Sequence, residues 1–209
     1  IERISQHVGV PDHLDVANRI AESSLTLLKN DRDLLPLAGT RTARVLSVSY
    51  RRSSDVLAGR YFNRVLRETY PRLTTAEVDA DTQQSIYQGL TRRAREQDMV
   101  VVSTYVTSVN VSGSFMLPED LVDFITELRR IGVPHTVVSF GNPYLIKDFS
   151  DVQSYLLAWS GSEASQRAAG RALLGQIQIA GRIPTRIPPM FEIGDGLSIP
   201  SKAQNAGGR

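Results

Sequence analysis

Short apolar segments of strand character alternate with segments of helical periodicity, and this alternation constrains the fold more than any other feature. Five segments predict strands: residues 45–50, 73–78, 98–106, 136–140 and 155–159. Four helical patterns follow strands, starting at Ser53 or Ser54, near Thr82, at Pro118 and at Ser162. Strands that alternate with helices favour a mostly parallel sheet with helices on both faces. The sequence therefore predicts an α/β fold, namely a flavodoxin-like α/β sandwich.

The N-terminal part predicts a helix that Asp12 caps and whose apolar face continues to Leu28. Residues 27–31 are expected to end this helix, and residues 34–37 to form an extended apolar arm. This pattern divides the chain into three parts. We expect residues 1–36 to form a leading helix and arm, residues 37–200 the sandwich, and residues 201–209 a disordered polar tail.

Two of the inner helices have an apolar face that can be assigned from spacing alone. Leu57, Tyr61, Val65 and Leu66 are expected to share one face of the helix after the first strand. Ile86, Leu90 and Ala94 recur every four residues in the helix over residues 82–97. These side chains are predicted to pack on the sheet.

Composition excludes several classes of protein and of site. The chain has no cysteine, which excludes disulfides and thiolate chemistry. No apolar run approaches the roughly 20 residues that span a bilayer, so no membrane span is expected. Neither the composition nor any targeting signal fixes the compartment, which stays open between a bacterial cytoplasm and export, with export favoured.

Arginines gather between residues 41 and 72, where eight of them face only Asp55 and Glu68. Such a region could bind nucleic acid or another polyanion. It could instead be a solvated helix face, or a surface that pairs with another domain. No aromatic residues alternate with the arginines in the manner of a nucleic-acid site, which favours the second interpretation and no nucleic-acid partner.

Four segments together resemble glycoside hydrolase family 3. Residues 21–31 with 34–37 are similar to the helix and arm that lead into the family's C-terminal domain. Residues 139–144 contain the Asn-Pro-Tyr turn of the N-acetylhexosaminidase branch, and residues 181–184 are similar to the family's Gly-Arg-Leu-Pro close. The remaining segment comprises residues 157–160, 163–164 and 172–175. The resemblance covers residues 12–188.

This resemblance implies an α/β domain that packs on a preceding (β/α)8-type barrel of the same parent chain, so that residues 1–36 lead in from a barrel domain that is missing here. It also implies that the parent hydrolyses a β-glycoside with retention of configuration. Retaining enzymes need a carboxylate nucleophile and a general acid/base. In this family the nucleophile is an aspartate of the barrel, and β-glucosidases take the acid/base glutamate from the loop after the third strand. Here that loop, residues 107–117, has no Asp, Glu or His.

The missing glutamate favours the β-N-acetylhexosaminidase branch, in which a barrel histidine is the acid/base, with β-glucosidase as the runner-up. We therefore expect a parent that hydrolyses terminal β-N-acetylglucosaminides, and a C-terminal scaffold that is inactive alone. The chain is expected to hold no catalytic residue, metal or cofactor; its three histidines do not have metal-ligand spacing. Possible sugar-facing residues at the carboxyl edge of the sheet are Tyr105, Asn110, Asn142 and Trp159. For Trp159, a core or interdomain position is the alternative.

A second interpretation is a stand-alone, non-catalytic module that binds carbohydrate or protein. The leading helix distinguishes the two interpretations. An apolar face left exposed on that helix favours a domain separated from its partner, and a surface without such a patch favours the module.

Overall fold

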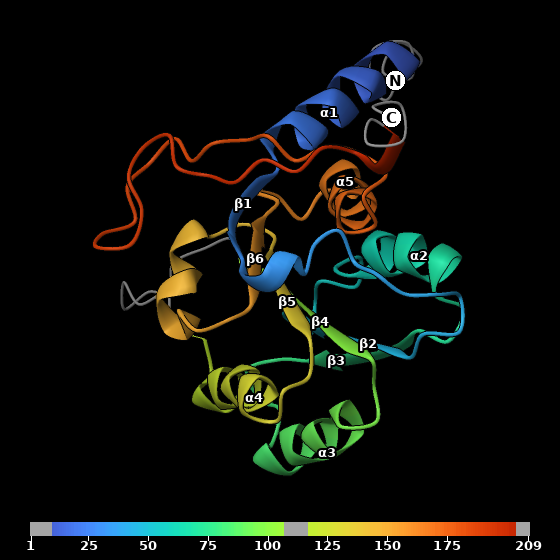
Figure 1. Cartoon of the computed structure of the whole chain (residues 1–209), viewed down its shortest axis with the longest axis vertical. Coiled ribbons are helices and arrows are strands. Elements are labelled where there is room, and N and C mark those ends of the chain that lie inside the picture. The colour runs from blue at the N-terminus through green and yellow to red at the C-terminus, as the bar shows by residue number, and fades with distance from the viewer. Residues whose placement is uncertain (1–9, 107–116, 204–209) are drawn as a thin grey trace.

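The computed structural model describes residues 10–106 and 117–203, which form a six-stranded sheet between layers of helices (Figure 1). The strands are β1 (Thr26–Asn30), β2 (Val45–Tyr50), β3 (Thr74–Val78), β4 (Met99–Thr104), β5 (His135–Ser139) and β6 (Ser154–Leu157). Their order is β1-β6-β5-β4-β2-β3. All neighbouring strands are parallel except β1, which runs antiparallel to β6. The predicted mostly parallel sheet is confirmed, and strands β2 to β6 have the flavodoxin-like order.

Helices cover both faces of this sheet (Figure 1). On one face lie α2 (Arg60–Thr69) and α5 (Glu163–Leu173), and on the other lie α3 (Gln84–Ala94) and α4 (Glu119–Arg130). The 3-10 helix η3 (Pro143–Phe149) follows β5, and a second one, η2 (Asp31–Asp33), follows β1. The two faces bury two separate apolar clusters, one around Phe62 and Leu173, the other around Phe124 and Leu145.

Strand β4 shows why the central strands are apolar along their whole length. Val101 contributes to the cluster under α2 and α5, whereas Val100 and Val102 contribute to the cluster under α3 and α4. All three are at most 1% exposed. A parallel strand with helices on both faces needs apolar side chains on both sides, and a continuous valine run supplies them.

Residues 26–30 form a strand, so the prediction that residues 27–31 end the first helix was wrong. Helix α1 covers Pro11–Ser24 only. Leu27 packs into the cluster under α5 and Leu28 into the opposite one, which is the period-two alternation of a strand. Leucines at this spacing also fit a helical stripe, so pairing with β6 decided the outcome.

Two assignments to helix faces were also wrong. Helix α2 begins at Arg60, after turns over residues 53–59, so Leu57 precedes it and is 46% exposed. Gly59 stops the helix from starting earlier because its φ is +80°, outside the helical region. In α3, Ile86 is 52% exposed, and the neighbouring Tyr87 is buried in its place.

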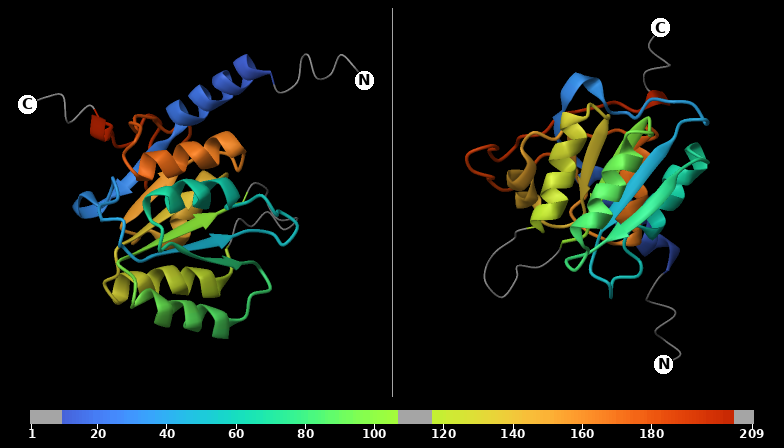
Figure 2. Two further views of the ribbon diagram at one scale, coloured as in Figure 1. Left: turned by 90° about the vertical axis from the view of Figure 1, so that its right-hand side faces the viewer. Right: turned by 90° about the horizontal axis from the view of Figure 1, so that it is seen from below.

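Helix α1 extends beyond the layer that α5 forms (Figure 2). Only Ala21 of α1 is buried, and the helix is held to α5 by an ion pair between Glu22 and Arg171. Val16 and Ile20, one turn apart on the helix, remain 44% and 64% exposed. An apolar face of α1 therefore lies open to solvent.

The C-terminal segment returns along the outer edge of β1. The amide of Gly181 donates to the carbonyl of Leu25 at 3.0 Å, and that of Leu197 donates to the carbonyl of Leu27 at 2.7 Å. A Cβ at Gly181 would lie 2.4 Å from the Leu25 oxygen, so only glycine fits there. These contacts cover a sheet edge that would otherwise expose free hydrogen-bonding groups. Within the described ranges, no helix is both long and apolar enough to cross a membrane.

Candidate functional site at the carboxyl edge of the sheet

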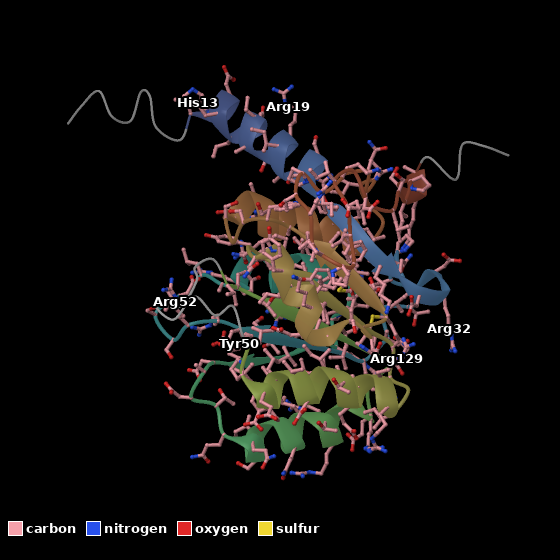
Figure 3. The ribbon with its side chains drawn as sticks, turned by 90° about the vertical axis from the view of Figure 1, so that its left-hand side faces the viewer. His13, Arg19, Arg32, Tyr50, Arg52 and Arg129 are labelled. Atoms are coloured by element: carbon pink, nitrogen blue, oxygen red, sulfur yellow. The ribbon has the colours of Figure 1, made fainter. Side chains whose placement is uncertain are left out.

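The carboxyl ends of the parallel strands meet at one edge of the sheet, where open α/β folds bind their ligands. The side-chain view places Tyr50 and Arg52 at this edge and Arg129 at the opposite one (Figure 3). The strand order reverses between β2 and β4, so the segments after these two strands flank the switch point. Three of the four predicted sugar-facing residues are at this edge, and Asn110 lies outside the described residues.

Tyr105, directly after β4, is part of a buried aromatic cluster. Its ring stacks on Phe140 with centroids 4.6 Å apart, and Phe140 meets Phe62 edge-on at 5.5 Å. The residue is 6% exposed, and burial raises the pKa of the Tyr105 hydroxyl. Gly161 lies close to this ring, since a side chain at position 161 would place its Cβ 3.4 Å from the Tyr105 ring. Tyr105 is therefore a neutral side chain that supports the edge from below.

Asn142 follows β5 and shapes the chain at the same edge. Its side-chain oxygen accepts from the amide of Tyr144 at 2.8 Å, which caps η3. The backbone N–H of Asn142 donates to the Val106 carbonyl at 2.9 Å, and this hydrogen bond joins the end of β5 to the end of β4. The residue is 7% exposed. The Asn-Pro-Tyr turn thus has a clear structural role.

Trp159 follows β6 in a left-handed backbone conformation, with φ at 62°. Its indole N–H donates to the carbonyl of Ser24 at 2.9 Å and lies 3.3 Å from the Thr26 hydroxyl. The half-buried ring packs against the cluster under α4, on the opposite face of the sheet from Tyr105. Trp159 therefore fastens the junction between α1 and β1. A role of these residues in contacting sugar remains a prediction.

Gln166 is a positioning residue at this edge that sequence reasoning missed. It is fully buried in α5, and its side-chain oxygen faces the amides of Tyr61 and Phe62 at 3.2 and 3.4 Å. Its side-chain nitrogen donates to the carbonyls of Leu57 at 3.1 Å and Gly161 at 2.8 Å. One amide thus joins the loop before α2 to the loop before α5. A glutamine within a helical pattern gives no sign of this role.

A small hollow of about 220 Å³ lies beside the ends of β2 and β3. Arg51 contacts Glu77 there and donates to two backbone carbonyls at 3.1 and 3.2 Å. Asp79 accepts from Ser53 at 2.7 Å and from Thr82 at 2.9 Å. The hydrogen bond from Ser53 has the largest effect and that from Thr82 the next largest, and both lower the pKa of the Asp79 carboxyl.

Arg51 pairs with Glu77 and Ser53 with Asp79 in this hollow, although the Arg51 Nε is buried without a hydrogen-bond partner among the described residues. A general acid at neutral pH needs a raised pKa, and the pKa of Asp79 is shifted the other way. Within the described part of the chain, no three His, Asp or Glu side chains are grouped as metal ligands would be. The edge therefore supplies a defined shape and polar groups, several of them charged, that bond within the domain.

The fold and this edge define a class: an open, doubly wound α/β domain whose sheet is extended by one antiparallel strand. The particular family follows from the sequence. Residues 25–205 match the sequence model of the glycosyl hydrolase family 3 C-terminal domain, and the chain belongs to this family. The predicted membership is thereby confirmed.

Solved structures that share the fold include enzymes of two specificities. A fungal multi-domain family 3 β-N-acetylglucosaminidase matches with a TM-score of 0.73 and 19% identity, over 88% of this chain and 20% of its own. The β-glucosidase of Listeria innocua, in complex with gluconolactone, gives 0.68 and 20% over 85% and 27%. A family 3 β-N-acetylglucosaminidase of Paenibacillus sp. gives 0.61 and 20% over 83% and 32%.

The chain thus spans about a fifth to a third of the length of these enzymes. At this identity the likeness shows the fold, and the neighbours do not distinguish between the two specificities. No match was found among curated protein sequences.

Proposed function

We propose that this chain is the scaffold domain of a retaining β-N-acetylglucosaminidase, in which a preceding barrel supplies both catalytic groups. The observation that carries the proposal is the composition of residues 107–117 after β4. This segment contains no Asp, Glu or His. A loop without a titratable group cannot protonate a leaving oxygen. The proton must then come from elsewhere in the parent, as the resemblance to the N-acetylhexosaminidase branch implies.

The described residues of the carboxyl edge support the same division of labour. Tyr105 is buried and neutral there, Trp159 is half-buried, and Gln166 joins the loops that precede α2 and α5. Such an edge can hold a fixed shape against a catalytic barrel without taking part in proton transfer. In this proposal the domain determines the rim of the active site and keeps water from one side of it.

The exposed face of α1 supports a domain with a partner over a stand-alone module. Val16 and Ile20, one turn apart on the same face, are each more than 40% exposed on a helix that extends beyond the α/β layers. An apolar helix face in water is typical of a docking surface. In this proposal the face packs on the barrel of the same parent chain.

Hydrolysis assays with chromogenic β-N-acetylglucosaminide and β-glucoside test the proposal, with this chain alone and with the parent that contains the barrel. We expect no turnover by this chain, and turnover by the parent with the N-acetylglucosaminide preferred. Preference for the glucoside would assign the parent to the β-glucosidase branch and reject the proposed substrate. Turnover by this chain alone would reject the scaffold role.

A further inference from the structure

Helix α2 carries a row of arginines on its outer face, here called the arginine stripe: Arg60, Arg64 and Arg67. The spacing of four and three residues places these side chains on one side of the helix. All three are exposed, whereas Phe62, Val65 and Leu66 on the other side are buried. The stripe extends for about 10 Å along the helix axis.

The arginine stripe has no ion-pair partner among the described residues, whereas eight other arginines do. Arg44, Arg95 and Arg171, for example, pair with Asp98, Glu127 and Glu22. Glu163 of α5 pairs with Arg167 at 2.7 Å, and the charge of Arg64 contributes to lowering the pKa of the same carboxyl without forming an ion pair with it. Glu68, which follows Arg64 by one turn, forms no ion pair with it.

Further arginines extend the positive surface at both ends of the stripe. Arg72 is in the exposed turn just after α2, and Arg41 is in the loop that reaches the same end, where Gly39 approaches the Tyr70 ring. At the other end, Arg167 of α5 lies over the Tyr61 ring, 5.3 Å from its centroid. Five arginines without an ion pair in the described part of the chain thus gather on and beside α2, with Glu68 as the acidic residue of that helix, in a protein whose formal net charge is only +2: Arg41, Arg60, Arg64, Arg67 and Arg72.

From this surface we infer a second binding site, one that holds a linear anionic glycan along α2. Guanidinium groups bind carboxylate or sulfate oxygens in pairs, and a row of them suits a polymer with regularly spaced charges. A nucleic acid would gain much of its affinity by stacking bases on aromatic rings. The three stripe positions are all arginine, and the nearby Tyr61 is already covered by Arg167. A charged glycan therefore fits this surface better than a nucleic acid.

In this inference the domain holds the polymer while catalysis takes place elsewhere in the parent. The site does not depend on which glycoside the parent hydrolyses, because it uses only residues of this chain. It can therefore be tested with the chain alone, and its failure would leave the proposed activity untouched.

The experiment measures binding of polygalacturonate oligomers, which carry one carboxylate per sugar, by isothermal titration calorimetry at low salt. Neutral dextran oligomers of equal length serve as the uncharged probe. We expect the chain to bind polygalacturonate and not dextran, with an affinity that falls as salt rises. The triple variant R60Q/R64Q/R67Q should bind at least about 10-fold more weakly, because each lost charge-assisted contact weakens binding.

A matched control removes the same charge elsewhere, with R19Q/R92Q/R93Q on α1 and α3. These three arginines are also exposed and form no ion pair within the described ranges. We expect this control variant to bind polygalacturonate with an affinity within about 2-fold of that of the unsubstituted chain. Both variants should keep the circular dichroism spectrum of the unsubstituted chain. Equal losses in the two variants, or no binding of polygalacturonate at all, would overturn the inference. Tighter binding of single-stranded DNA with the same number of charges would overturn the choice of a glycan.

Discussion

At the scale of single residues, His135 is a titratable group that the fold keeps neutral. It begins β5, is 1% exposed, and its Nδ1 lies 2.9 Å from the Val133 carbonyl, to which it donates. Its Nε2 is buried without a hydrogen-bond partner among the described residues. Burial, with smaller contributions from Arg129 and Lys29, lowers the pKa of His135 below its usual 6.5. Protonation in the folded state is therefore unfavourable.

The unfolded chain takes up this proton more readily than the folded chain does, so acid favours unfolding. Stability from His135 should be complete above pH 6.5 and should decline as the pH falls toward the lowered pKa. We expect the free energy of unfolding, measured in urea, to fall by up to about 1.4 kcal/mol per pH unit across this window. The variant His135→Gln should be less stable at pH 7 but should lack this part of the pH dependence.

His13 provides the matched control, since it is exposed on α1 near its N-terminal end (Figure 3). His13→Gln should leave both the stability and its pH dependence unchanged. A pH profile of His135→Gln that parallels the unsubstituted chain would show that other groups cause the acid sensitivity.

Of the candidate site, the sequence could predict positions but not roles. Tyr105, Asn142 and Trp159 are at strand ends as expected, because strand boundaries follow from the apolar runs. Their contacts could not be predicted, since each depends on residues distant in sequence. The indole of Trp159 reaches Ser24 across 135 positions, and Gln166 reaches Leu57 across 109. Interactions of this range have no periodic signal.

At the scale of elements, the packing of α2 on α5 depends on one glycine. A Cβ at Gly170 of α5 would lie 2.9 Å from both Cβ and Cγ1 of Val65 in α2. Gly170→Ala should therefore separate the two helices and destabilise the fold by about 1–3 kcal/mol, despite the better helix propensity of alanine. Urea or thermal unfolding would measure this loss.

Gly89 of α3 gives the same substitution without the clash. A Cβ there would meet only the end of the Arg92 side chain, at 3.8 Å. Gly89→Ala should therefore stabilise the chain by up to about 1 kcal/mol through helix propensity alone. Opposite signs for the two substitutions are expected; a stabilising Gly170→Ala would contradict the close approach of α2 and α5.

The five parallel strands and the helices between them were predictable because their patterns are local. Each strand is a short apolar run, and each helix has its own apolar stripe, a proline or a cap, such as Ser162 at the start of α5. Strand β1 was not predictable in this way. Its leucines fit both periods, and its pairing with β6 joins residues more than 120 positions apart. Local patterns thus defined the parallel core, whereas tertiary pairing defined its antiparallel edge.

At the scale of the whole molecule, the domain has a complete interior and one incomplete surface. Two buried clusters fill both faces of the sheet, and the C-terminal segment covers its β1 edge. Helix α1 extends from this body with apolar side chains in solvent (Figure 2). The interior therefore has the packing of a domain core, and α1 is the candidate surface for contact with a neighbour.

We therefore expect the isolated chain to self-associate through α1 as its concentration rises. The variant Val16→Ser/Ile20→Ser should shift the molecular mass measured by light scattering toward the monomer. The free energy of unfolding should change by no more than about 0.5 kcal/mol, because both side chains are exposed. The control Val56→Ser removes an apolar side chain that is 72% exposed but lies away from α1, in the turns before α2, and it should leave self-association unchanged.

The two measurements together separate a docking surface from a structural one. If the variant still self-associates, another surface mediates the association, and α1 is not supported as a docking surface. A large loss of stability would mean that Val16 and Ile20 support the domain itself. Only a monomeric variant with unchanged stability fits a helix whose apolar face exists for a neighbouring domain, because such a face contributes nothing to the fold that presents it.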